Sequence, residues 1–270
     1  IAAGEMLLAF AQVEPQSRYD LADVATVASR DGEAWRLDGR KGVVLHGDCA
    51  DSVIVTARVG GGQRERDGIG LFLVNAQTDG ISRRGYATQD GLRAAEIELS
   101  GVRVGPEGVL GPPGHALPMI ERAVDQAIAA LCADGVGVMA SMHEMTLDYL
   151  KTRKQFGRAI GEFQVLQHRA ADMYIALEQA RSMALFATMM AAEADPRERR
   201  PAIAAAKIQI GRSGRKIGQE AIQLHGGIGM TMEYKVGHLF KRMTMIDVTF
   251  GDADAHLAAL ARTGGLFGDV

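Results

Sequence analysis

Residues 6 to about 110 carry short apolar or alternating runs separated by turn residues, a pattern that predicts β-strands. The dipeptides Asp31-Gly32 and Asp38-Gly39 predict hairpins, and the glycine-rich residues 60–70 predict an exposed loop. We therefore expect this half to form a small antiparallel barrel or sandwich. The expected strands are residues 6–13, 25–30, 33–37, 42–45, 52–58, 70–74 and 94–102.

The pattern changes after a glycine- and proline-rich linker at residues 108–113, where apolar residues begin to recur once per helical turn. The apolar positions are mostly Ala, Leu, Ile and Met with few aromatics, which favours closely packed antiparallel helices. The chain is thus predicted to be an α+β protein, with a β-domain at residues 1–112 and a helical bundle domain at residues 113–270. The expected helices are residues 116–153, 163–194, 200–225, 234–247 and 252–262.

Composition narrows the class of protein. Of the 270 residues, 47% are hydrophobic and 23% are charged, which is ample for one or two buried cores. The net charge is −3 and the basic residues are scattered, so no nucleic-acid partner is expected. We interpret the charged run Arg197–Arg200 as a solvated loop between helices. We expect no membrane span, because no apolar run reaches about 18 residues.

The two cysteines occur in different settings. Cys49 lies in a hairpin region and Cys132 inside an apolar helix. This pattern indicates two buried thiols in a reducing compartment, with neither a disulfide nor a metal site, and predicts a cytoplasmic protein.

Two polar, glycine-punctuated corners stand out at helix ends. The first is Gln223-Leu224-His225-Gly226-Gly227-Ile228-Gly229, where glycines let backbone amides approach an anionic ligand. Simple helix termination is the alternative interpretation of these glycines. The second is Arg153-Lys154-Gln155-Phe156-Gly157, followed by Gly161-Glu162-Phe163-Gln164.

These two motifs, in this order, resemble the C-terminal helical domain of the acyl-CoA dehydrogenase family. Residues 9–15 resemble that family's flavin-contacting strand and turn, and residues 37–41 resemble the start of its hairpin. The resemblance covers essentially the whole chain. It implies an FAD-dependent oxidoreductase that introduces an α,β double bond into an acyl-CoA thioester in fatty acid or other lipid metabolism. The family's N-terminal helical domain has no counterpart here, so we expect the sequence to be a fragment.

The resemblance also implies a set of cofactor contacts. Arg153 would meet the FAD pyrophosphate, which suits the fork of donors on a guanidinium, although a solvent-facing cation at a helix end is the alternative. The Gln223–Gly227 turn would donate backbone hydrogen bonds to a cofactor held mainly by a neighbouring subunit, in a tetramer built as a dimer of dimers. The implied cofactor-binding residues are Gln12, Val13, Arg153, Phe156, Gln164, Gln223, His225, Gly226 and Gly227.

The flavin pattern is incomplete at the amino end. Where the family commonly has Thr-Glu-Pro-Gly-x-Gly, this chain has Val13-Glu14-Pro15-Gln16-Ser17-Arg18, without the hydroxyl and both glycines. The family's flavin-covering Trp-Ile-Thr corresponds to Val43-Val44-Leu45. These losses indicate that the flavin contacts of the β-domain have decayed or been rebuilt.

The catalytic base of the family also has no counterpart. An ungapped match places Phe250 at the usual glutamate and Gly251 on the glycine after it, and the alternative base position on the first long helix falls on Ala127. Neither Phe250 nor Ala127 can take a proton, so the catalytic residue is left unassigned. Asp252 is a candidate substitute base, but it is also suited to capping a helix, and Asp125 lies two residues from Ala127.

Three hypotheses follow from these gaps. In the one we favour, the chain pairs with a homologous subunit that supplies the base and the rest of the flavin site. Such unequal pairs occur in the family among enzymes acting on dicarboxylyl or steroid side-chain thioesters. Alternatively, the chain is a self-sufficient dehydrogenase with Asp252 as a relocated base, or a non-catalytic structural homologue. An electron-transfer flavoprotein is the electron acceptor that the family resemblance implies.

Overall fold

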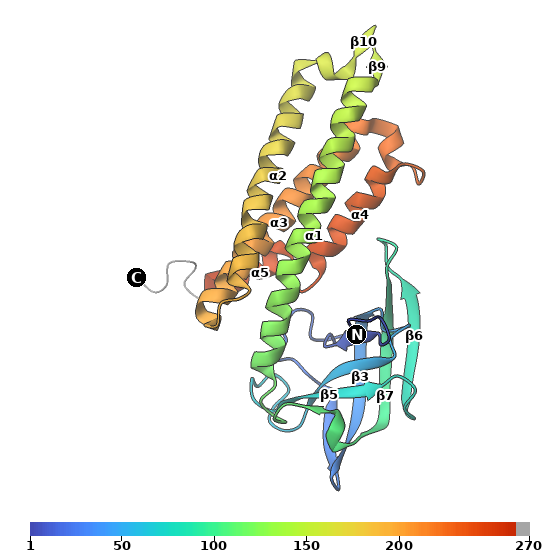
Figure 1. Ribbon diagram of the computed structural model, residues 1–270, viewed down its shortest axis with the longest axis vertical. Coiled ribbons are helices and arrows are strands. Elements are labelled where there is room, and N and C mark those ends of the chain that lie inside the picture. Colours follow the sequence, from blue (N-terminus) through green and yellow to red (C-terminus); the bar gives the residue numbers. More distant parts are fainter. Residues whose placement is uncertain (263–270) are drawn as a thin grey trace. The chain divides into compact units, whose positions relative to one another are not determined.

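The computed structural model describes residues 1–262. It divides into two compact units, one at Ile1–Arg122 and the other from Ala123 onward, and the long helix α1 (Leu117–Thr152) crosses the boundary (Figure 1). Each unit is described separately below.

The first unit is a β-unit built on one eight-stranded sheet. Its strand order is β6-β7-β3-β2-β4-β5-β8, and β1 pairs with β4 off this path. The neighbours are antiparallel except that β1 runs parallel to β4 and β2 meets β4 at one parallel position. The strands are β1 (Leu8–Ala11), β2 (Val27–Asp31), β3 (Ala34–Leu45), β4 (Ser52–Arg58), β5 (Ile69–Asn75), β6 (Ile81–Ala87), β7 (Arg93–Val104) and β8 (Val109–Leu110).

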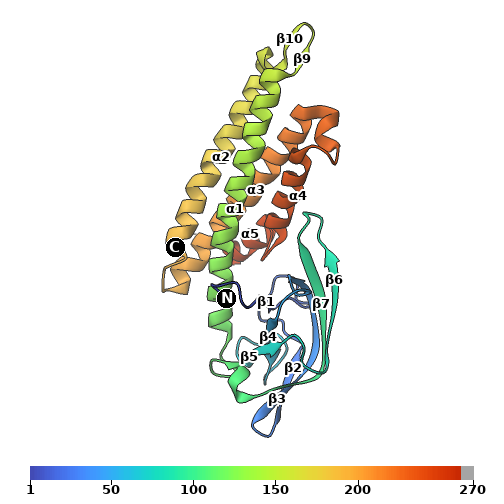
Figure 2. The same cartoon turned by 45° about the vertical axis from the view of Figure 1, so that its right-hand side comes forward.

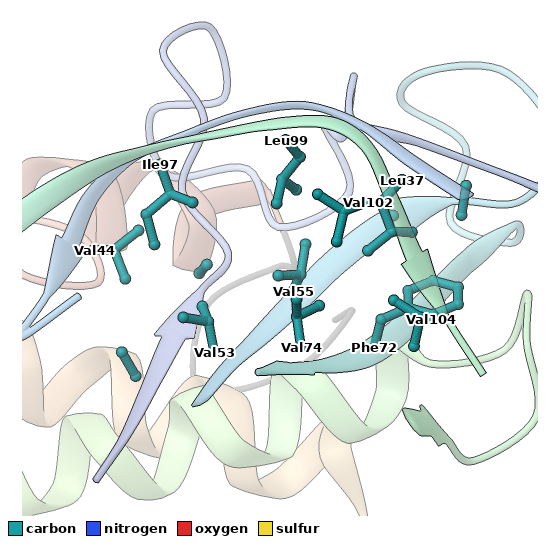
Figure 3. Close-up of a cluster of buried hydrophobic side chains, with 14 of the residues drawn as sticks. Leu37, Val44, Val53, Val55, Phe72, Val74, Ile97, Leu99, Val102 and Val104 are labelled. Carbon is teal, nitrogen blue, oxygen red and sulfur yellow. The ribbon is translucent and has the colours of Figure 1, made fainter. Parts of the chain in front are cut away.

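The sheet folds over a single apolar core. Figure 3 shows side chains from β3 and β7 facing those from β4 and β5, including Leu37, Ile97, Val55 and Phe72. The alternation of buried and exposed residues along β3 and β7 produces this arrangement, because successive side chains of a strand point to opposite faces. The predicted barrel or sandwich is confirmed, with mixed rather than purely antiparallel pairing.

One of the two predicted hairpins is confirmed and the other is wrong. Asp31 pairs with Ala34 across a tight turn in which Gly32 has φ +64°. Asp38-Gly39, in contrast, lies inside β3, which continues through two irregularities in its pairing with β7. A Cβ atom at Gly39 would lie 2.5 Å from Thr26 Oγ1, so this glycine permits close packing rather than a turn.

The second unit is helical. After α1 comes a short hairpin of β9 (Lys154–Gln155) and β10 (Arg158–Ala159). The helices that follow are α2 (Gln164–Met190), α3 (Pro196–His225), α4 (Lys235–Val248) and α5 (Ala253–Arg262), and a 3₁₀ segment at Gly226–Met230 joins α3 to α4. Figures 1 and 2 both show α1, α2 and α3 lying side by side along much of their length. The predicted helical bundle is therefore confirmed.

The interpretation of Arg197–Arg200 as a loop is wrong. Asp195 caps α3 by accepting from the Arg197 amide at 2.9 Å, and Pro196 occupies its first turn, so the charged run is helical. Arg199 is buried, and its Nε donates to Asp125 Oδ2 at 2.8 Å. A partner 74 residues away explains why a local pattern misses this burial.

Two further expectations need correction. Cys132 is buried as predicted, but Cys49 is exposed, because it lies in the turn that follows β3. We also expected no segment long and apolar enough to span a membrane. By length and composition alone α1 is such a segment, because one of its 18-residue windows has a mean hydropathy of 1.4. That window is 44% buried, and core helices of soluble proteins pass the same test.

Candidate functional site

The Arg153–Gly157 corner is a tight hairpin rather than a bare helix end. Lys154–Gln155 pairs with Arg158–Ala159, and the two residues between them, Phe156 and Gly157, have φ +54° and +81°. Positive φ at both positions defines the turn type whose twist matches paired strands. The turn leaves the Phe156 side chain 91% exposed at its tip. An aromatic ring held this far into solvent is available to stack on a planar ligand.

Residues around the hairpin hold it in place. The Ile160 amide donates to the Arg153 carbonyl at 2.8 Å, and the Phe163 ring meets Phe156 edge-on at 6.1 Å. The Arg158 guanidinium lies over the Phe163 ring at 5.0 Å. Gln164 begins α2 with an exposed side chain. Arg153 is also exposed, and within residues 1–262 its side chain forms no ion pair.

The Gln223–Gly229 corner is the glycine turn at the end of α3. Gly226 has φ +63°, which ends the helix and explains why glycine stands there. Gly226 and Gly227 are exposed, and a Cβ atom built on either would meet nothing within 4 Å. The open space in front of this backbone is what close approach of a ligand requires. Gln223, one turn earlier, is exposed as well.

The structure joins the two corners at one end of the helical unit. The His225 ring stacks on Tyr149, one turn before Arg153, with ring centroids 4.6 Å apart. His225 itself is only 3% exposed, and its Nδ1 donates to the Ala221 carbonyl at 2.8 Å. Burial lowers the pKa of this imidazole. The His225 side chain thus supports the corner from within.

The β-unit residues at the flavin-like strand serve the fold. Gln12 and Val13 are half-buried after β1, and the Val13 carbonyl accepts from the Gly42 amide at 2.9 Å. Glu14 is 2% exposed, and its Oε1 accepts from Nζ of the fully buried Lys41 at 2.6 Å. The Glu14 carboxylate also accepts from the Ala25 amide at 2.8 Å. The Glu14 carboxylate therefore forms its hydrogen bonds and its ion pair with groups inside the β-unit.

Electrostatics of this pair follow from its burial. Burial lowers the pKa of Lys41 to about 8, while the Glu14 charge opposes that shift. Burial alone would raise the pKa of Glu14, but the Lys41 ammonium holds it below its usual value. Both groups are charged at neutral pH, as a buried ion pair with additional hydrogen bonds allows.

Val43, at the place of the family's flavin-covering tryptophan, is conformationally unusual. It has φ +49° in an irregularity of β3 between Lys41 and Val44, and its side chain is 48% exposed. A β-branched residue at positive φ is strained. The surrounding structure must therefore hold the backbone bulge at Val43 in this strained conformation. The side chain at the bulge is aliphatic and exposed.

The turn after α4 carries no proton acceptor at the expected position. Phe250 has φ +57° and Gly251 has φ +108°. His256 Nε2 donates to the Phe250 carbonyl at 3.0 Å, and a Cβ atom at Gly251 would lie 2.7 Å from that nitrogen. Burial, together with the nearby Lys207 charge, lowers the pKa of His256 to about 4. The neutral imidazole holds the turn through this hydrogen bond.

The neighbouring carboxylates have structural partners. Asp252 Oδ1 accepts from the Ala255 amide at 2.8 Å, which is the capping interaction that the sequence allowed. Asp125 is buried in its ion pair with Arg199. Ala127, the alternative base position, is half-buried on α1.

Sequence reasoning missed a buried lysine beside this turn. Lys207 of α3 is fully buried, and its Nζ donates to the carbonyls of Ile246 at 2.5 Å and Asp247 at 2.8 Å, in the last turn of α4. Burial lowers its pKa to about 8, while Asp247 opposes the shift. The available signal was a lysine within an otherwise apolar helical stretch, Ala202–Ile208. Within residues 1–262, no three His, Cys, Asp or Glu side chains are grouped so as to hold a metal ion.

Comparison with known proteins identifies the family. The family models described as "Acyl-CoA dehydrogenase, middle domain" and "Acyl-CoA dehydrogenase, C-terminal domain" match residues 9–102 and 117–265. The chain is 29% identical over 265 residues to the probable acyl-CoA dehydrogenase YngJ of Bacillus subtilis (strain 168), covering 97% of this chain and 69% of that protein. It is 28% identical to the mitochondrial 2-methylacyl-CoA dehydrogenase of Solanum tuberosum, covering 96% of this chain and 63% of that protein.

Solved structures give the same result. A glutaryl-coenzyme A dehydrogenase in complex with glutaryl-CoA superposes with a TM-score of 0.89 at 26% identity, over 97% of this chain and 67% of that one. The chain therefore spans only about two thirds of the length of these relatives. The chain belongs to the acyl-CoA dehydrogenase family, of which it carries the middle and C-terminal domains.

Proposed function

We propose that the chain is one subunit of an FAD-dependent acyl-CoA dehydrogenase and that a homologous subunit supplies the base and most of the flavin contacts. FAD would accept the hydride when a thioester is oxidised to its α,β-unsaturated product. The residues of this chain would bind and orient part of that cofactor. The relatives named as acyl-CoA dehydrogenases support the reaction class.

The helical corners fit an FAD molecule. Arg153 is an exposed cation without an ion-pair partner in the described residues, and a guanidinium is suited to a pyrophosphate. Phe156 offers an exposed ring for the nucleotide, and Gln164 an exposed amide. The space in front of Gly226 and Gly227 leaves their backbone open to approach. This chemistry is concentrated at one end of the helical unit.

The β-unit fits the same cofactor poorly. Position 13 is Val and position 45 is Leu, so neither can offer the hydroxyl that the family pattern has there. The Glu14 side chain is buried against Lys41 and cannot reach outward. We infer that the flavin served by the helical corners is held mainly by the β-unit of another subunit.

The observation that carries the base-lacking assignment is the turn after α4. Phe250 occupies the position matched to the family's glutamate, and the nearby His256 and Asp252 are engaged in hydrogen bonds that hold the turn. A side chain acting as general base must be within hydrogen-bond reach of the proton it removes. We therefore place the base on the partner subunit.

The outward face of α2 supports contact with another subunit, in an assembly that we propose is a tetramer built as a dimer of dimers. The inward face of this helix is lined by Ala170, Met173, Leu177 and Ala180. Its other side is also rich in large apolar side chains, and a helix that is apolar on both faces favours burial of both. These exposed residues are Tyr174, Ile175, Leu185, Phe186 and Met189.

An electron-transfer flavoprotein is the proposed electron acceptor. One relative, 27% identical over 89% of this chain, is the subunit CarC of a caffeyl-CoA reductase–Etf complex from Acetobacterium woodii.

A cytoplasmic setting is proposed from the free thiols of Cys49 and Cys132.

Co-purification of the full-length protein with and without a homologous subunit tests this proposal. We expect the chain alone to hold no flavin, whereas the complex holds FAD whose oxidised absorption is bleached by an acyl-CoA. A yellow, substrate-bleached chain on its own would instead favour the self-sufficient enzyme. Flavin-free protein with every homologous partner would leave a non-catalytic structural homologue.

A further inference from the structure

Three rings lie in a row beside the two corners, with His225 stacked on Tyr149 and tilted against Tyr234. The His225 ring lies between Tyr149, at 4.6 Å and an interplanar angle of 30°, and Tyr234, at 5.0 Å and 50°. Tyr149 belongs to the last turn of α1, His225 is the final residue of α3, and Tyr234 immediately precedes α4. The end of α1 thus meets the α3–α4 connection at one imidazole.

The stack closes the glycine corner. Residues 226–233 form the connection between α3 and α4, and their two flanking rings, His225 and Tyr234, are in contact. His238 of α4 donates from Nε2 to the Met232 carbonyl of that connection at 2.8 Å, and within it the Thr231 amide donates to the Ile228 carbonyl at 3.1 Å. The backbone of Gly226 and Gly227 is therefore held at both ends.

The same stack reaches the hairpin corner. The Tyr149 carbonyl accepts from the Arg153 amide at 2.9 Å, and the Arg153 carbonyl accepts from the Ile160 amide at 2.8 Å. A displacement of the Tyr149 ring would pass through this backbone to the hairpin that carries Phe156. The Nδ1 hydrogen bond to Ala221 fixes the plane of the imidazole from the α3 side.

We propose that His225 is a positioning residue whose ring, packed between Tyr149 and Tyr234, locks the glycine corner and the Phe156 hairpin at a fixed separation, so that they act as one bipartite clamp. This inference rests on the proposed function for the identity of the ligand, a flavin dinucleotide. The mechanical coupling itself belongs to this chain alone. Because His225 is buried, it acts through the two corners and does not touch the cofactor.

The helical unit offers a matched control. His143 of α1 is buried and contacts Tyr174 of α2 with ring centroids 5.8 Å apart. It is a third histidine–tyrosine contact in the same unit, and neither residue belongs to a corner. A variant at His143 therefore removes a similar contact without entering the stack of Tyr149, His225 and Tyr234.

The test combines hydrogen exchange of the full-length chain with FAD titration of the complex with its homologous subunit. We expect His225→Ala to speed amide exchange in residues 153–160 by about tenfold and to weaken FAD affinity by a similar factor, because a lost aromatic stack frees the hairpin. His225→Phe, which keeps a ring in the stack, should restore both values to within about twofold. His143→Ala should change neither.

Unchanged exchange in the hairpin of His225→Ala, or a His225→Phe protein that behaves like His225→Ala, would overturn the clamp. If His225→Ala does not fold, His225→Leu takes its place with the same expectations, since it keeps apolar volume without a ring. The hydrogen-exchange and FAD-titration measurements also distinguish a failure of the clamp from a failure of the proposed function. A wild-type complex that binds no FAD defeats the proposed function, whereas the exchange measurement still decides the coupling.

Discussion

The helical corners and the flavin-like strand of the β-unit preserve the same family's cofactor pattern to different degrees. In the helical unit, Arg153, Phe156, Gly226 and Gly227 remain exposed and open to a ligand. In the β-unit, the Glu14 carboxylate is instead buried on Lys41. The difference teaches that residues of one family pattern can differ in what they serve, since the helical corners leave theirs exposed whereas Glu14 stabilises the core.

The largest expected effect is on stability, when the buried Lys41–Glu14 ion pair of the β-unit is broken. Lys41→Met leaves the Glu14 carboxylate buried without its ammonium partner, and such losses cost roughly 3–5 kcal/mol of folding stability. Urea unfolding of the variant and the wild type at pH 7 measures this loss of stability. The double variant Glu14→Gln with Lys41→Met should recover a large part of that loss, and a single variant as stable as the wild type would show that the pair has no structural role.

The second prediction compares the buried lysines of the two units. Lys207 has a pKa of about 8, below the ordinary 10.5, so between pH 8 and 10.5 the unfolded chain binds more protons than the folded one. Stability should therefore rise with pH in this window, by up to about 3 kcal/mol from this residue. The free energy of unfolding, measured in urea at pH 8 and pH 10, should rise less in Lys207→Met than in the wild type. The remaining rise is the contribution of Lys41, whose pKa is also about 8. Equal slopes in wild type and variant would contradict the assignment.

The third prediction breaks the helical side of the comparison. Arg153→Ala should weaken FAD retention by the assembled complex about 10- to 100-fold, because it removes a charge-assisted contact to the pyrophosphate. The exposed side chain makes no ion pair in residues 1–262, so the melting temperature should hardly change. Arg212→Ala, another exposed cation of the helical unit, is the control and should retain flavin. Full flavin stoichiometry in Arg153→Ala would remove this residue from the site.

The smallest expected effect concerns Asp252. Asparagine is as good a helix cap as aspartate, so Asp252→Asn should leave both stability and turnover of the complex nearly unchanged. Steady-state kinetics with the complex and thermal melts measure these. A loss of turnover by several orders of magnitude would identify Asp252 as the base and return the chain to the self-sufficient class.

The helices were predictable because their signal is strong and local. Apolar periodicity over long stretches gives α1, α2 and α4 to within four residues at each end. Strand β6, Ile81–Ala87, was missed, since this strand at the end of the sheet order is largely exposed and polar. Strand β3 was split at Asp38-Gly39 because the chain continues there through an irregularity that resembles a turn in sequence.

The site was predictable in its backbone and less so in its side chains. Glycines at 226 and 227 and the polar corner at 153–157 follow from the motif, but the hairpin turn places the non-glycine Phe156 at positive φ, which no local preference indicates. The burial of Lys41, Arg199 and Lys207 depends on partners 27, 74 and 39 residues away. Likewise, the ring stack on His225 arises only when three helix ends meet.

Cryo-electron microscopy of the full-length protein in complex with its homologous subunit tests the central claim most directly. The account predicts FAD density between chains, with Arg153 and the Gly226–Gly227 backbone of this chain within hydrogen-bonding distance of the dinucleotide and a carboxylate of the other chain near the reactive end of the flavin. Corners that face solvent in every assembly, with the flavin bound elsewhere or absent, would contradict it.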